Sequence, residues 1–162
     1  NNLYKTSVVK TNNILYKENI KMGEDLLFNL EYANYASNYE YVTQPLYKYN
    51  VETVGSALKL TRLSYIHDYT QIYNYLLTYY SEKKFEKYKD VVYFMNGMFM
   101  NLAGADYDLK HPFIKEFEKS QLYTDISKES LTSKKLKLKQ WFIVKHIYRN
   151  RFMKEFVKRI FI

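Results

Sequence analysis

Two adjacent carboxylates in the first third of the chain are the residues best placed to do chemistry. Glu24 and Asp25 follow Gly23 and precede an apolar run that starts at Leu26. A positioned carboxylate can act as a general base, which typically accelerates a reaction by about 10²–10⁴-fold. Acids in a first helical turn also stabilise the helix against its macrodipole, by about 0.3–1 kcal/mol each. Spacing alone leaves both roles open and favours the structural one.

The element that must position these carboxylates is a helix. The sequence predicts it over residues 24–36, after the break at Gly23 and before a stop at Asn38. Adjacent residues on a helix point about 100° apart, so Glu24 and Asp25 cannot face each other and share one proton. At most one of them can therefore be a working base.

The rest of the chain divides into a mixed part and a helical part. Before the carboxylates, residues 3–10 are expected to form a short helix; after them, residues 39–43 and 46–49 are expected to form two short strands around a turn. Beyond Ser56, apolar spacing predicts helices over residues 57–80, 85–105, 112–117 and 134–162. We therefore expect a mainly α chain with a small β element, divided into residues 1–56 and 57–162.

An ordered set of short motifs in the first third resembles the end of the catalytic domain of family 2 glycosyltransferases. The segments are Asn2-Leu3-Tyr4-Lys5, Lys17-Glu18-Asn19-Ile20, Gly23-Glu24-Asp25-Leu26-Leu27-Phe28-Asn29, Pro45-Leu46-Tyr47-Lys48-Tyr49-Asn50 and Gly55-Ser56. These enzymes are inverting, use nucleotide sugars, and make bacterial capsule, exopolysaccharide and wall polymers. The resemblance implies that residues 1–56 close a GT-A-like α/β catalytic domain and that residues 57–162 form a helical, bundle-like extension.

The resemblance also implies roles for single residues. Asp25 would be the general base that deprotonates an acceptor hydroxyl as it attacks the anomeric carbon. Glu24 would support that base or contact the acceptor. Tyr47, Tyr49 and Ser56 would lie on the acceptor side, where the acceptor is a saccharide or a lipid-linked saccharide.

The chain departs from the family in lacking the α/β half that binds the nucleotide. In the family that half ends in a metal-holding Asp-x-Asp after an apolar strand. The one Asp-x-Asp here, Asp106-Tyr107-Asp108, follows a helical stretch and Gly104, so we interpret it as a solvated turn. The chain, which starts without Met, is therefore expected to be the C-terminal portion of the enzyme, inactive alone and without cofactor or metal. Its partner would be the upstream half of the same polypeptide, which would use Mg²⁺ or Mn²⁺ with a nucleotide-diphosphate sugar.

Positive charge is concentrated at the C-terminal end. The formal net charge is +8. Residues 131–162 hold ten Lys and Arg against one acid, Glu155, whereas the other 130 residues are close to neutral. A basic end on a neutral body suits an anionic surface. Aromatic and basic residues are not interleaved as in a nucleic-acid recognition module, so we expect no nucleic-acid partner.

The final predicted helix has two interpretations. Its candidate contact residues for a membrane or a protein partner are Lys145, Arg149, Arg151, Lys154, Lys158 and Arg159. The helix either docks on the body with a solvated basic face or lies on an anionic membrane with its cations reaching the headgroups. A non-catalytic helical module that binds a membrane or partner in this way is the alternative function. The expected location is the cytoplasm, with a peripheral site on the inner face of the cell membrane as the variant.

Composition limits the remaining chemistry. The chain has no Cys, which excludes disulfides, thiolate zinc sites and cysteine nucleophiles. Its three histidines lack ligand spacing, so structural or exposed positions are expected for them. Tyr65, Tyr69, Tyr73 and Tyr80 recur at helical spacing, which predicts packing of one helix on another more simply than a sugar-stacking platform.

Overall fold

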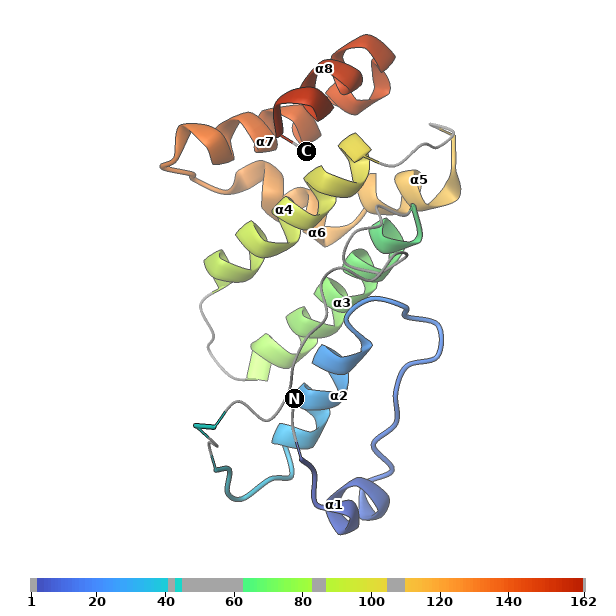
Figure 1. Cartoon of the computed structure of the whole chain (residues 1–162), viewed down its shortest axis with the longest axis vertical. Helices are drawn as coiled ribbons and strands as arrows, with labels where there is room; N and C mark the ends of the chain where they lie inside the picture. Colours follow the sequence, from blue (N-terminus) through green and yellow to red (C-terminus); the bar gives the residue numbers. More distant parts are fainter. Residues whose placement is uncertain (1–2, 41–42, 45–62, 83–86, 105–109, 162) are drawn as a thin grey trace. The chain divides into compact units, whose positions relative to one another are not determined.

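The computed structural model describes residues 3–40, 43–44, 63–82, 87–104 and 110–161 (Figure 1). These residues form helices, turns and loops, and no strand. The chain divides into two compact units, Asn1–Leu60 and Thr61–Ile162. The division lies four residues beyond the boundary predicted after Ser56.

The first unit contains α1 (Thr6–Thr11) and α2 (Glu24–Ala33). Gly23 precedes α2 with a φ of 90°, a left-handed conformation that glycine adopts without a steric cost. α2 ends three residues before the predicted end. The Asn34 N–H donates to the Glu31 carbonyl, an i→i−3 bond that tightens and closes the last turn.

The small β element is not found in the described part of this unit. Residues 39, 40 and 43, which belong to the first expected strand, have no strand structure. The remainder of that strand and the whole of the second, residues 46–49, lie outside the described residues.

The second unit is a set of packed helices. In chain order they are α3 (Leu63–Glu82), α4 (Lys87–Gly104), α5 (Pro112–Glu118), α6 (Gln121–Lys128), α7 (Lys134–Val144), the 3₁₀ turn η2 (Ile147–Arg149) and α8 (Arg151–Phe161). α4 is central: α3, α6, α7 and α8 all contact it. In Figure 1, α8 lies on the opposite side of α4 from α3.

The tyrosine stripe on α3 packs helix on helix, as predicted. Tyr65, Tyr69 and Tyr73 are buried, and the rings of Tyr69 and Tyr73 meet the edge or face of Phe94 on α4. The approach is close at Gly97, where a Cβ would lie 2.7 Å from the Tyr69 ring. Tyr80 lies in α3, but its side chain is outside the described part.

Helix α6 was not predicted. It lies between the helices predicted over residues 112–117 and 134–162 and ends at Lys128. Its beginning carries a local signal, because the Ser120 side chain caps the helix by accepting from the Tyr123 N–H at 3.2 Å. Leu122 and Ile126, four residues apart, supply its buried face.

The prediction of one helix over residues 134–162 was wrong. The chain leaves the helical path after Val144, passes through η2, and resumes a helix at Arg151. His146, with a φ of 51°, takes the left-handed conformation at this corner. Contacts with α5 and α6, described below, account for the break.

Candidate functional site

The predicted base lies at the accessible start of α2. Asp25 is exposed, and its Oδ1 accepts a hydrogen bond from the Leu26 N–H at 2.8 Å. Glu24 is half-buried. Further along α2, Leu27 and Phe28 are buried and anchor the helix. Their packing holds the second turn of α2 in the core and leaves its first turn at the surface.

Segments that carry the resemblance meet around α2. The Tyr4 ring packs edge-on against Phe28 at 5.0 Å, and its hydroxyl donates to Oδ1 of Asn29. Lys17 forms an ion pair with Glu31 at 2.6 Å. Two motif segments, around Tyr4 and Lys17, therefore contact the helix that carries a third. These contacts fix the direction of α2 relative to the preceding chain.

The other residues expected at the acceptor side are not placed. Tyr47, Tyr49 and Ser56 lie outside the described residues, as does Asp106-Tyr107-Asp108. Within the described residues, no three His, Asp or Glu side chains gather into a group that could hold a metal ion.

The predicted basic contact residues do not share one environment. Lys145, Arg151 and Arg159 are exposed, whereas Lys154 and Lys158 are half-buried. Arg149 differs from the rest because its Nη2 bonds both carboxylate oxygens of Glu118, at 2.6 and 2.7 Å. Arg149 is exposed, but it forms an ion pair with a residue of the same chain.

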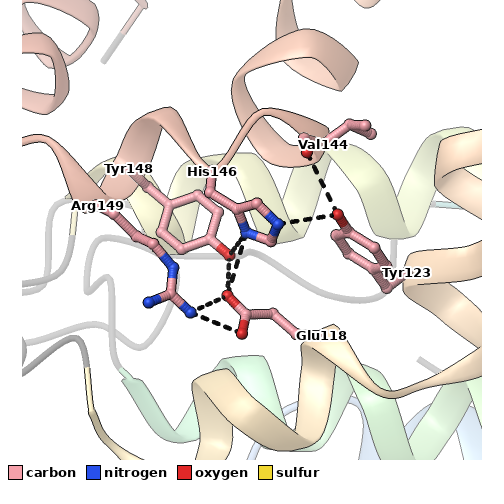
Figure 2. Close-up of polar contacts among 6 residues, drawn as sticks. All are labelled: Glu118, Tyr123, Val144, His146, Tyr148 and Arg149. Atoms are coloured by element: carbon pink, nitrogen blue, oxygen red, sulfur yellow. Dashed lines mark hydrogen bonds and ion pairs between the residues drawn. The ribbon is translucent and has the colours of Figure 1, made fainter.

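The Glu118 pair is part of a larger cluster that sequence reasoning missed (Figure 2). Glu118 Oε1 also accepts from the Tyr148 hydroxyl at 2.5 Å and lies 3.2 Å from Nδ1 of His146. The other ring nitrogen of His146 is 3.2 Å from the Tyr123 hydroxyl, which donates to the Val144 carbonyl. The cluster therefore joins α5 and α6 to the corner between α7 and α8.

Donors and acceptors in the cluster match. Tyr148 donates to Glu118, so its oxygen can accept from Nδ1 of His146 at 2.9 Å. Tyr123 donates to Val144, so its oxygen can accept from Nε2 of the same ring. These contacts hold the corner between α7 and α8 against α5 and α6. We call the five side chains, Glu118, Tyr123, His146, Tyr148 and Arg149, the brace.

The surroundings of Glu118 and Tyr148 shift the pKa values of both side chains. Burial disfavours the Glu118 carboxylate, but hydrogen bonds from Arg149 and Tyr148 and the charges of Arg149 and His146 outweigh it. They hold the pKa of Glu118 below its ordinary value of 4.5. Burial, together with the adjacent Glu118 carboxylate, raises the pKa of Tyr148 well above its ordinary range, so this hydroxyl stays a donor.

We expect the brace to make the protein less stable in acid. A lowered pKa in the folded state stabilises the fold above the ordinary pKa, and this stabilisation is lost as pH falls through the folded value. Glu118→Gln should therefore cost about 1–2 kcal/mol of unfolding free energy near pH 7, with the cost shrinking as pH falls below 4.5 and through the lowered pKa of the folded state. Urea unfolding across this pH range measures both.

Glu155→Gln is the matched control, since it removes the same charge from an exposed position on α8. It should leave the unfolding free energy near neutral pH almost unchanged. A cost for Glu118→Gln that stays constant from pH 7 to pH 3 would show that the side chain acts through packing rather than charge.

The other two histidines also have structural contacts. His67 on α3 bonds Glu116 on α5 at 2.8 Å and stacks on Phe113. His111 caps α5 by accepting from the Phe113 N–H at 3.3 Å. These positions agree with the expectation that the histidines are structural.

Comparison of the chain with protein-family models, curated protein sequences and solved structures found no match. None of the helices in the described part of the chain combines the length and hydrophobicity that a membrane crossing requires.

Proposed function

We propose that this chain is the C-terminal part of an inverting, family 2 type glycosyltransferase that uses a nucleotide sugar. The observation that supports the proposal best is the ordered motif set around Gly23, Glu24 and Asp25, together with the exposed position of Asp25 at the first turn of α2. The product would be a bacterial capsule, exopolysaccharide or wall polymer.

In this proposal, Asp25 takes the proton of an acceptor hydroxyl while that oxygen attacks the anomeric carbon of the donor sugar. The bond from the anomeric carbon to the nucleotide diphosphate breaks, and the nucleotide leaves with the electron pair. Asp25 lies at the N-terminal end of α2, where a negative charge stabilises the helix. Glu24, half-buried beside it, supports the position of the first turn.

The donor site and its Mg²⁺ or Mn²⁺ belong, in this proposal, to an upstream half of the same polypeptide. This chain would then supply the base and the acceptor side. An acceptor linked to a lipid would bring the enzyme to the inner face of the cell membrane from the cytoplasm.

The alternative is a non-catalytic helical module that binds a membrane or a protein through its basic end. The exposed apolar and basic side chains of α8 favour this alternative. It requires no donor site, which separates it from the first proposal.

The natural coding sequence upstream of Asn1 tests the proposal first. A preceding α/β half that closes in Asp-x-Asp after an apolar strand supports the transferase. The complete polypeptide is then assayed with nucleotide sugars and Mg²⁺ or Mn²⁺ for nucleoside-diphosphate release that depends on an acceptor. Absence of such a half would overturn the proposal and leave the binding module.

A further inference from the structure

The apolar face of helix α8 is only partly covered by the elements that it packs against. At about 100° per residue, the apolar side chains that the structure describes on α8 span an arc of roughly 140°. They are Phe152, Met153, Phe156, Val157 and Ile160. The charged residues occupy the opposite half.

Among the described side chains of this apolar face, burial is confined to one edge. Val157 is 6% exposed, and α8 contacts α4 and η2. Phe152, Phe156 and Ile160, spaced four residues apart, remain 79%, 53% and 56% exposed. These three residues, which we call the α8 ridge, form a continuous apolar stripe along the exposed side of the helix.

Cations border the α8 ridge. Arg159 is exposed next to it on the helix circumference, and Arg151, Lys154 and Lys158 follow around the charged half with one acid, Glu155. The positive charge continues into α7 and the corner, where residues 134–149 add six Lys and Arg and no Asp or Glu, although one of the six, Arg149, is paired with Glu118. The positive region is thus much broader than the ridge itself.

We propose that α8 docks on an anionic lipid bilayer, with the α8 ridge inserted at the headgroup boundary and the cations among the phosphates. An apolar stripe beside a wide basic region is typical of helices that lie in the membrane interface. Five of the eleven residues of α8 carry a charge, which the hydrocarbon core of a bilayer disfavours, so the helix lies along the surface. A broad excess of cations fits an extended anionic surface better than a protein groove, where a ridge of this width would face a few matched acids.

The brace around Glu118 gives α8 its orientation in this proposal. It turns the chain at residues 145–150, so that α8 starts in a new direction instead of extending α7. A continuous helix would carry the ridge away from this position. The proposal rests on the alternative function given above and names its partner, and it does not depend on the proposed transferase activity.

Vesicle sedimentation tests the docking. The full chain is mixed at low salt with vesicles of phosphatidylcholine and phosphatidylglycerol, or of phosphatidylcholine alone. We expect binding to the anionic vesicles, at least tenfold weaker binding to the neutral ones, and loss of binding as salt screens the charges. No detectable binding to anionic vesicles at low salt would overturn the proposal and leave a protein partner for the ridge.

Two matched pairs of variants locate the contact. Phe152→Ser with Phe156→Ser should weaken binding about tenfold or more, whereas Leu15→Ser, at a position 59% exposed in the first unit, should not. Arg151→Glu with Arg159→Glu should weaken it about 25-fold or more, since each cation near an anionic surface contributes about fivefold.

Lys10→Glu with Lys128→Glu is the charge control, because it changes net charge by the same amount at exposed positions outside α8. Equal losses in the two charge pairs would show attraction by net charge alone and overturn docking through α8. Unchanged binding after both Phe substitutions would do the same.

Fluorescence reports insertion directly. With the natural tryptophan removed by Trp141→Phe, a single tryptophan from Phe156→Trp should shift to shorter wavelength on anionic vesicles and be quenched by brominated lipid. The same probe from Leu15→Trp should do neither. A Phe156→Trp probe that stays as accessible to water as in free protein would contradict insertion.

Discussion

Asp25→Asn is expected to lower the transfer rate of the complete enzyme by about 10²–10⁴-fold. The amide keeps the size and hydrogen-bonding shape of the carboxylate but cannot accept the acceptor proton. Donor binding should be almost unaffected, because the donor site is expected in the other half of the polypeptide. Acceptor-dependent release of nucleoside diphosphate measures the rate, and nucleotide-sugar titration measures donor affinity.

Two carboxylates serve as controls for this substitution. Glu24→Gln, beside the base, should have a smaller effect, and Glu40→Gln, at an exposed position outside the motifs, should have none. Loss of the negative charge from the first turn of α2 costs about 0.3–1 kcal/mol, so the fold should persist in circular dichroism. Turnover by Asp25→Asn at the wild-type rate would remove Asp25 from the mechanism.

Phe94→Ala is expected to destabilise the second unit by about 3–5 kcal/mol, the usual cost of removing a buried phenyl group. Phe94 is 1% exposed on α4, and its ring contacts Tyr69 and Tyr73 of α3 at centroid distances of 5.8 and 5.4 Å. The substitution leaves a cavity between the two long helices and removes aromatic contacts that add about 0.5–1.5 kcal/mol each. Urea unfolding followed by helical circular dichroism measures the change.

The adjacent residue provides the control for the cavity. Tyr93 is 60% exposed on the same helix, so Tyr93→Ala should cost less than about 1 kcal/mol. Phe94→Leu, which keeps most of the apolar volume, should cost about 1.5 kcal/mol or less. A Phe94→Ala variant no less stable than Tyr93→Ala would contradict the packing of α3 on α4.

Residues with a local signal were predicted well. The apolar spacing of α3 and α4, the proline that opens α5 and the glycine before α2 all lie within a few residues of the structure they produce. The position of Asp25 in the first turn of α2 follows from the same kind of signal. Its role as a base stays a prediction, because it depends on residues expected elsewhere in the polypeptide.

The end of the chain shows where local signals fail. Residues 134–162 read as one helix, since no glycine or proline interrupts their spacing. The amphipathic pattern of α8 is encoded by neighbouring residues. The direction of the helix and the choice of its exposed edge are not. They depend on the turn at His146, whose partners Glu118 and Tyr123 lie more than twenty residues earlier.

The sequence by itself determined the mainly helical character, the concentration of charge at the C-terminal end and the two faces of α8, because periodicity and composition act over a few residues. The tertiary structure decided that α7 and α8 are separate helices and which edge of α8 stays exposed. Glu118 and Arg149 are 31 residues apart, and Gln140 reaches the Ile126 and Glu129 carbonyls at the end of α6. Such bonds form only when the helices have packed, so no local pattern can encode them.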